Sequence, residues 1–167
     1  MAERSKALAQ RLLGMMKERG LTLATAESCT AGCLATLLAD APGGGERFHG
    51  GFVVYTKENK TVALGVPAEV IAARSAVSQP VAEAMATGVL ERCPADVAVA
   101  ITGVAGPEPD EDGNPVGLMH IAVAVRGSGI RHRRHSFGEA ERGELRRRAM
   151  HAALELAEVM MMEADGG

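Results

Sequence analysis

Apolar residues follow two different periods along the chain, and the changes between them mark out alternating helices and strands. Leucine and methionine recur every three to four positions over residues 3–19, which predicts an amphipathic helix ended by Gly20. Short runs rich in Val, Ile or Phe predict strands. The predicted strands are residues 21–26, 50–55, 95–102, 116–126 and 130–137. The further predicted helices are residues 29–39, 56–64, 67–73, 80–92 and 139–162.

The order of these elements defines the expected fold. Strands and helices alternate up to residue 102, and the last two strands then form a hairpin around Gly127-Ser128-Gly129. This order predicts an α/β protein, a single-domain layered α/β/α fold with a mixed sheet flanked by helices. The length of 167 residues suits one domain over residues 1–167.

Composition and charge exclude several classes of function. The net charge is −3 and aromatic residues make up 2%, so we expect no nucleic-acid partner. No apolar run reaches the ~20 residues that span a bilayer, and charges interrupt residues 1–20, so we expect no membrane segment and no signal peptide. Three cysteines, Cys29, Cys33 and Cys93, form neither a disulfide framework nor a zinc motif. We therefore expect a cytoplasmic protein without a bound metal.

The polar cluster Glu27-Ser28-Cys29-Thr30 stands between a predicted strand and a predicted helix. Ser28 is thus expected at the mouth of a helix, where unpaired N–H groups and the positive end of the dipole gather. A serine there can cap the helix, which is the commoner role. It can also be a nucleophile whose oxyanion is stabilised by the same N–H groups. Cys29, whose thiolate would be stabilised there too, is a second candidate nucleophile.

Two more polar segments, Tyr55 to Lys60 and Thr102 to Pro107, also follow predicted strands. Ligands in such sheets bind outside the carboxyl ends of the strands, so the three segments are expected to converge. Arg outnumbers Lys by 14 to 4, so the lysines in the second segment stand out. A partly buried lysine can lose its proton, and a Ser–Lys or Ser–Tyr–Lys set activates serine without histidine. The alternative is that Lys57 and Lys60 form a solvated turn.

Other polar residues allow two interpretations each. The glycines between Thr102 and Pro107 either let a ligand approach the backbone or form a plain turn. Arg142 starts the last predicted helix, where a cation is unfavourable, which indicates an anionic ligand or a pairing with Glu139 or Glu141. The basic residues 131–135 are expected on an exposed strand face that deters edge pairing, and the histidines among them point to opposite faces.

Several of these segments together resemble one protein family. Residues 25–32, Thr-Ala-Glu-Ser-Cys-Thr-Ala-Gly, are similar to its motif Thr-Ala-Glu-Ser-Cys-Thr-Gly-Gly. Its other blocks are matched by Tyr55 to Lys60 followed by Leu-Gly-Val at 64–66, and by Ala-Val-Ser at 76–78, Thr-Gly-Val-Ala-Gly-Pro at 102–107 and Pro-Val-Gly at 115–117. Over roughly residues 5–160 the chain resembles the CinA C-terminal domain family, the nicotinamide-nucleotide amidohydrolases, in a stand-alone form.

The resemblance implies deamidation of nicotinamide mononucleotide to nicotinate mononucleotide and ammonia, with no cofactor and no metal. It implies that Ser28 is the nucleophile, with Tyr55 and Lys60 providing its base. The residues expected to bind substrate are Glu27, Thr30, Gly32, Thr102, Gly103 and Arg142. A small-molecule nucleotide is the expected partner, and a homo-oligomer, a dimer or larger, is the expected assembly. The alternative is a nucleotide-binding or regulatory module of the same fold that has lost turnover.

Overall fold

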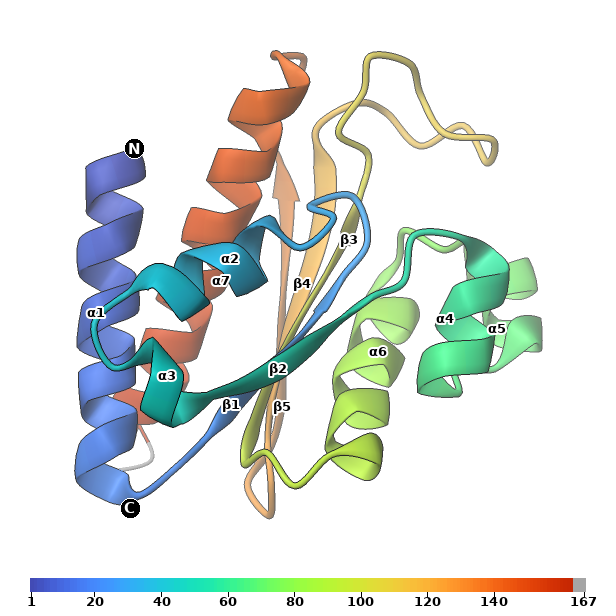
Figure 1. Ribbon diagram of the computed structural model, residues 1–167. Coiled ribbons are helices and arrows are strands. Elements are labelled where there is room, and N and C mark those ends of the chain that lie inside the picture. Colours follow the sequence, from blue (N-terminus) through green and yellow to red (C-terminus); the bar gives the residue numbers. More distant parts are fainter. Residues whose placement is uncertain (164–167) are drawn as a thin grey trace.

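A five-stranded mixed sheet forms the centre of the molecule, with helices on both faces (Figure 1). The computed structural model describes residues 1–163. The strands are β1 (Leu23–Glu27), β2 (Phe48–Val53), β3 (Val97–Gly103), β4 (Leu118–Val125) and β5 (Gly129–Ser136). They lie in the order β2-β1-β3-β4-β5. Strand β1 is parallel to β2 and β3, and β4 is antiparallel to both of its neighbours, β3 and β5. This arrangement confirms the predicted α/β/α fold with a mixed sheet and a late hairpin.

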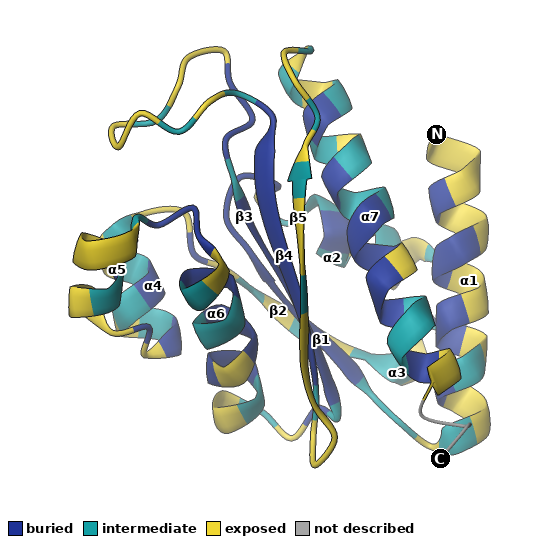
Figure 2. Cartoon of the chain, turned by 180° about the vertical axis from the view of Figure 1, so that it is seen from behind, coloured by how far each residue is buried: buried dark blue, intermediate teal, exposed yellow. Residues whose placement is uncertain are grey.

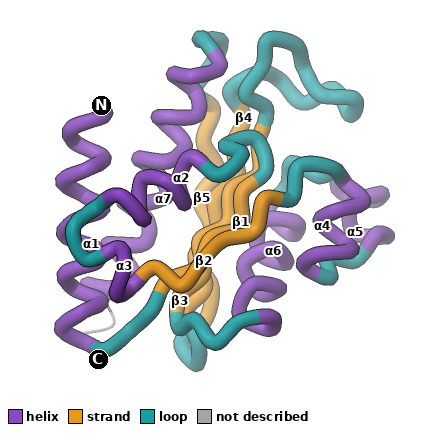
Figure 3. Tube along the Cα trace, in the orientation of Figure 1, coloured by secondary structure: helices purple, strands orange, loops and turns teal. Residues whose placement is uncertain are grey.

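Two groups of helices cover the two faces of the sheet (Figure 3). One face is covered by α1 (Ala2–Arg19), α2 (Cys33–Asp40), α3 (Gly44–Arg47) and α7 (Arg142–Glu163). The other face is covered by α4 (Lys57–Leu64), α5 (Ala68–Arg74) and α6 (Gln79–Arg92). The sequence pattern did not predict α3, a single turn between Gly43 and β2, because four residues are too few to show a helical period.

Side chains alternate across the strands and divide the core in two. Val97 and Val99 join the cluster beneath α1 and α7, whereas Ala98 and Ala100 join the cluster beneath α6. The alanine-lined side allows α6 to lie close to β3 and β4, because small side chains leave little space between a helix and a sheet. This burial holds the carboxyl ends of β1 and β3 in a fixed position.

The segment after β1 differs from its prediction. The helix predicted to begin at residue 29 begins at Cys33, because Ala31 and Gly32 have φ values of 49° and 92°, which a right-handed helix cannot contain. Two successive turns replace the first helical turn: the Ala31 N–H donates to the Ser28 carbonyl, and the Cys33 N–H donates to the Thr30 carbonyl, each at 3.0 Å. Ser28 is therefore not the cap of a helix.

The two edge strands of the sheet differ in exposure: residues of β2 alternate between half-buried and exposed, whereas most residues of β5 are exposed. β5 is exposed along most of its length (Figure 2), and it carries the basic residues 131–135 as predicted. His132 stacks on His120, whereas His135 stacks on Phe137, which is consistent with opposite faces. In the described chain, no helix is long and apolar enough to cross a membrane. A frayed tail is also expected from the sequence over residues 163–167. Apart from Glu163, the last residue of α7, it lies outside the described residues.

Candidate active site

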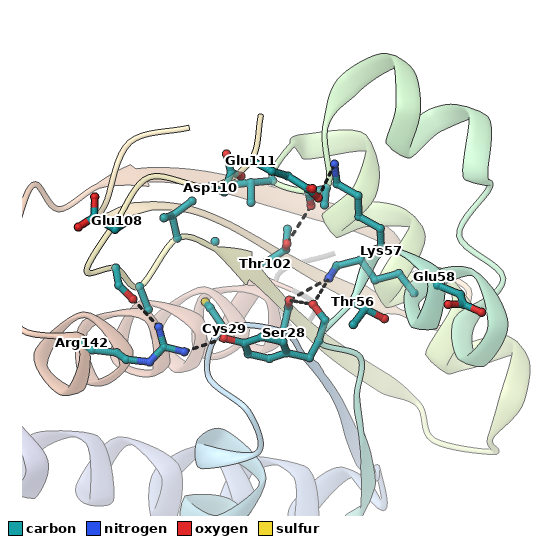
Figure 4. A pocket seen from close by; sticks show the side chains of 18 residues that line it. Ser28, Cys29, Thr56, Lys57, Glu58, Thr102, Glu108, Asp110, Glu111 and Arg142 are labelled. Atoms are coloured by element: carbon teal, nitrogen blue, oxygen red, sulfur yellow. Dashed lines mark hydrogen bonds and ion pairs between the residues drawn. The ribbon is translucent and has the colours of Figure 1, made fainter. Parts of the chain in front are cut away.

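A cavity of about 540 Å³ opens where β1, β2 and β3 end (Figure 4). It is the place at which ligands bind in open α/β sheets. The three polar segments that follow these strands contribute to its wall, and α7 closes one side with Arg142. Residues of the wall that the sequence had singled out are Ser28, Cys29, Tyr55, Lys57, Lys60, Thr102, Gly103 and Arg142.

Lys60 lies at the inner end of the cavity and is almost fully buried, with 2% of its surface exposed. The residue sits one turn into α4, a helix whose first turn is capped by the Thr56 hydroxyl accepting the Asn59 N–H at 3.0 Å. Its Nζ lies 2.9 Å from Ser28 Oγ and donates to the carbonyls of Val54 and Tyr55 at 3.0 and 3.3 Å. Burial, assisted by the positive charge of nearby Lys57, lowers the pKa of Lys60 to about 8.

Ser28 is held by the sheet although it lies beyond the end of β1. Its N–H donates to the carbonyl of Ile101 on β3 at 3.0 Å, which extends the β1–β3 pairing by one residue. Its Oγ also lies 3.5 Å from the Tyr55 carbonyl, a long contact next to the one with Lys60. Ser28, which follows β1, and Lys60, on the helix that follows the neighbouring strand β2, therefore lie within hydrogen-bond reach of each other.

Tyr55 presents its ring at the mouth of the cavity rather than beside Ser28. The side chain is 53% exposed, and its hydroxyl accepts a hydrogen bond from Arg142 Nη2 at 2.7 Å. Arg142 Nη1 donates to the Gly106 carbonyl. Neither Glu139 nor Glu141 forms an ion pair with Arg142 within the described residues. The guanidinium instead links the segment after β2 to the loop of residues 104–117 (Figure 4).

The outer rim is acidic and is held by one lysine. Lys57 Nζ forms ion pairs with Glu111 and Asp112 at 2.8 and 2.9 Å, and these hydrogen bonds raise its pKa. Asp112 also accepts from the Ser75 hydroxyl at 2.9 Å. Ser75 has a φ of 74°, a value that L residues rarely adopt, and its Oγ further accepts from Asn114 Nδ2 at 2.8 Å. The acidic loop, residues 108–114, is thereby fastened to the start of α4 and to the α5–α6 connection.

Thr102 and Gly103 line the cavity at the end of β3. Thr102 is buried and its hydroxyl donates to the Ala76 carbonyl at 2.9 Å, so its proton is already engaged while its oxygen lone pairs can still accept. Gly103 has a packing role as well, because a Cβ atom there would lie 2.1 Å from Met119 Sδ.

Three residues expected to bind substrate do not line the cavity. The Glu27 carboxylate is buried and accepts the N–H groups of Leu34 and Ala35 at 2.8 and 2.9 Å, so it caps α2 across the intervening turn. Thr30 is fully buried, and Gly32 precedes α2 with the positive φ that this turn needs. The polar cluster therefore separates into one residue that faces the cavity through its hydroxyl and others that build its support.

Cys29 does not fit the role of nucleophile. Its thiol is buried against Met119, with the two sulfur atoms 3.6 Å apart. Burial raises the pKa of Cys29 to about 12, and the nearby cation Arg146 offsets only part of that rise. A thiol with such a pKa is almost entirely protonated at neutral pH. The lowered pKa expected at a helix start is absent because no helix starts there.

Sequence reasoning missed two groups that shape this region. The carbonyls of Val54 and Tyr55, which receive Lys60, are backbone groups and leave no trace in side-chain patterns. Arg146 donates from Nε to the Cys29 carbonyl at 2.8 Å, but in the sequence it is one of several arginines on the last helix.

Within residues 1–163, no three His, Cys, Asp or Glu side chains are grouped so that they could hold a metal ion.

The geometry defines an α/β/α protein that places a serine–lysine pair at the carboxyl ends of parallel strands. Residues 5–161 match the family model described as CinA C-terminal domain, and the chain belongs to this family. The resemblance found in the sequence is thereby confirmed.

Relatives and solved structures agree with this assignment. A CinA-like protein of Mycolicibacterium gilvum is 49% identical over 137 residues, which cover 82% of this chain and 32% of that protein. A second, from Gemmatimonas aurantiaca, is 45% identical, covering 89% of this chain and 34% of that protein. The chain thus spans about a third of the length of these two relatives. The crystal structure of a competence/damage inducible protein from Agrobacterium tumefaciens superposes with a TM-score of 0.90 at 37% identity, covering 95% of both chains.

Proposed function

We propose that this protein is an amidohydrolase that converts nicotinamide mononucleotide into nicotinate mononucleotide and ammonia. The observation that carries the proposal is the buried Lys60 amine, 2.9 Å from the hydroxyl of Ser28 in a cavity large enough for a nucleotide. The similarity of the sequence motifs to nicotinamide-nucleotide amidohydrolases supports the choice of substrate. The competing choice of nucleophile, Cys29, is disfavoured by its raised pKa.

The contacts of Lys60 suit a base. A neutral amine has two N–H groups and one lone pair. The two N–H groups are matched by the carbonyls of Val54 and Tyr55, which leaves the lone pair for the third neighbour, the Ser28 hydroxyl. With its pKa at about 8, roughly a tenth of Lys60 is neutral at pH 7, and half of it at pH 8. Tyr55 does not contact Ser28 through its phenol, so Lys60 is the proton acceptor.

The reaction follows from this pair. Ser28 Oγ bonds to the carboxamide carbon while its proton moves to Lys60, and the carbonyl oxygen becomes an oxyanion. As the tetrahedral intermediate collapses, the C–N bond breaks and Lys60 returns the proton to the nitrogen, which leaves as ammonia. Water then attacks the ester and gives a proton to Lys60. As the acyl–oxygen bond breaks, Lys60 passes this proton to Ser28 Oγ, and the nicotinate product leaves. Lys60 ends each turnover in the state in which it began.

The substrate's remaining groups have partners along the wall. Arg142 uses two of its five N–H groups, on Tyr55 and Gly106, so its others can bind a phosphate at the mouth. Thr102 Oγ can accept from a ribose hydroxyl. These assignments orient the nucleotide with its carboxamide toward the inner end, where Ser28 lies, and its phosphate outward.

The test is ammonia release from nicotinamide mononucleotide by the wild-type protein, Ser28→Ala and Cys29→Ala. We expect the wild type and Cys29→Ala to release ammonia and Ser28→Ala to lose at least about a thousandfold in kcat, because it lacks the nucleophile. Release by Ser28→Ala at the wild-type rate would contradict the proposal. Mononucleotide binding by wild type without any ammonia release would instead favour the binding-module alternative.

A further inference from the structure

Arg146 holds the Ser28 turn from a position outside the cavity. It lies one turn beyond Arg142 on α7, and its Nε donates to the Cys29 carbonyl at 2.8 Å. Arg142 lines the cavity, whereas Arg146 does not. The guanidinium of Arg146 therefore binds a backbone carbonyl next to the proposed nucleophile. The orientation of that peptide decides where the following N–H group points.

The Cys29–Thr30 peptide is the central peptide of a β-turn. The turn covers residues 28–31 and is closed by the hydrogen bond from the Ala31 N–H to the Ser28 carbonyl. The central peptide of such a turn can adopt two orientations that differ by roughly half a rotation, as in types I and II. Thr30 keeps a negative φ, which selects against the type II orientation. The hydrogen bond from Arg146 holds the same orientation from the carbonyl side.

Fixing the carbonyl also fixes the N–H on the other side of the peptide. A trans peptide is planar, so its C=O and N–H point in opposite directions. With the Cys29 carbonyl on Arg146, the Thr30 N–H points to the opposite side of the turn. Among residues 1–163, the N–H groups of Cys29 and Thr30 donate to no protein acceptor. Cys29 and Thr30 directly follow Ser28 in the chain, so two backbone donors without a protein acceptor come from the same turn as its hydroxyl, as an oxyanion hole requires.

We propose that Arg146 is a positioning residue of the amidase. It holds the Cys29–Thr30 peptide so that the N–H groups of Cys29 and Thr30 donate to the oxyanion formed when Ser28 adds to the substrate carbonyl. This inference rests on the proposed function for its substrate but makes a separate claim about the turn. The donors come from a turn pinned by α7, in place of the helix start expected from the sequence.

Arg146→Met tests the proposal, because methionine fills similar space and donates no hydrogen bond. Removing an oxyanion donor outright costs about a hundredfold or more in kcat, so loosening the donors is expected to lower kcat about tenfold. KM should stay within about twofold, because the substrate ground state does not need the oxyanion donors. Arg146→Lys, which keeps a cationic donor, should recover part of the loss. The matched control is Arg147→Met on the same helix, because among residues 1–163 this arginine pairs with Glu144 alone.

A second assay separates this inference from the choice of substrate. The reaction of p-nitrophenyl acetate with Ser28 needs the same oxyanion donors and no nucleotide, and rates are normalised to the folded fraction measured by circular dichroism. A Ser28-dependent release of nitrophenol that falls in Arg146→Met supports the inference even if no ammonia is released from the mononucleotide. Equal rates in wild type and Arg146→Met overturn it. Complete absence of Ser28-dependent release also overturns this inference, whereas the proposed function is decided by ammonia release from the mononucleotide.

Discussion

The inner end of the cavity and its rim treat the same residue type in opposite ways. Lys57 and Lys60 lie three residues apart on α4. At the rim, the Lys57 side chain is 37% exposed, and two carboxylates raise its pKa. At the inner end, Lys60 is 2% exposed, and burial lowers its pKa to about 8. One lysine stays a cation that anchors a loop, and the other becomes able to accept a proton.

The difference shows that the pKa of each lysine is set by its burial and its neighbours, not by the residue type. Lys60 has no carboxylate partner in the described chain; its neighbours are two carbonyls and a hydroxyl. Such dipoles satisfy its N–H groups without stabilising a full charge as a carboxylate does, so desolvation dominates. Lys57 reaches Glu111 and Asp112, which stabilise its charged form. The comparison can be tested by changing each lysine to methionine.

The largest expected effect is on activity. Lys60→Met should lower kcat for ammonia release about a thousandfold, since general-base catalysis contributes about 10²–10⁴ in rate. Lys57→Met should change it less than about threefold, because its amine lies outside hydrogen-bond reach of Ser28. Both rates are measured on the mononucleotide at pH 8. Comparable losses in the two variants would erase the distinction between the inner end and the rim.

The second effect is on stability. Above pH 8 the folded protein loses the Lys60 proton while the unfolded chain keeps it up to pH 10.5, so the unfolded state binds more protons and stability rises with pH across this interval. Below pH 8 the full cost of burying the ammonium is present. Lys60→Met removes this dependence, so its stability relative to wild type should fall by about 2–3 kcal/mol between pH 7 and pH 10. Urea denaturation at both pH values measures it, with Lys57→Met as the control.

A smaller effect concerns the acidic loop. Asp112→Asn removes one ion pair of Lys57 but keeps an oxygen that can accept from Ser75. Since the pair is exposed to solvent, we expect a loss of stability of at most about 1 kcal/mol, which shrinks in 0.5 M salt. Thermal melts at low and high salt provide the measurement. A loss that salt leaves unchanged would show that the ion pair is not its cause.

The smallest expected effect is a shift in the pH profile. Activity of the wild type should rise with pH through about 8, as Lys60 loses its proton. The positive charge of Lys57 contributes to lowering that pKa, so in Lys57→Met the rise should move upward by a few tenths of a pH unit. The profile of kcat/KM from pH 6 to pH 10 reports the shift. Movement toward lower pH would contradict the sign of this interaction.

Much of the fold and the outline of the site could be predicted because both follow from local patterns. Val-rich runs marked the strands, and the rule that ligands bind at strand ends brought Ser28, Tyr55 and Lys60 to one expected cavity, where the structure indeed places their segments. The roles of these residues in catalysis stay predictions until the activity is measured.

The rest could not be predicted because it depends on contacts distant in sequence or on backbone conformation. The first turn of the helix after β1 was wrongly predicted, because Ala31 has a positive φ, which alanine rarely adopts and which the sequence therefore does not indicate. In the sequence, Glu27 is predicted to bind substrate. In the structure, its carboxylate instead accepts hydrogen bonds from two N–H groups of α2. Tyr55 pairs with Arg142, which is 87 residues away in the chain.

The link between Lys60 and β2 has a consequence for how the site responds to heat. The Val54 N–H donates to the Glu27 carbonyl at 2.9 Å, the Val54 carbonyl receives Lys60, and Ser28 directly follows Glu27. The distance between the Lys60 amine and the Ser28 hydroxyl therefore depends on the pairing of β1 with the edge strand β2. Deuterium would enter at the Val54 amide only when that pairing opens. The hydrogen-exchange rate of the Val54 amide therefore reports how often Lys60 and Ser28 separate as the temperature rises.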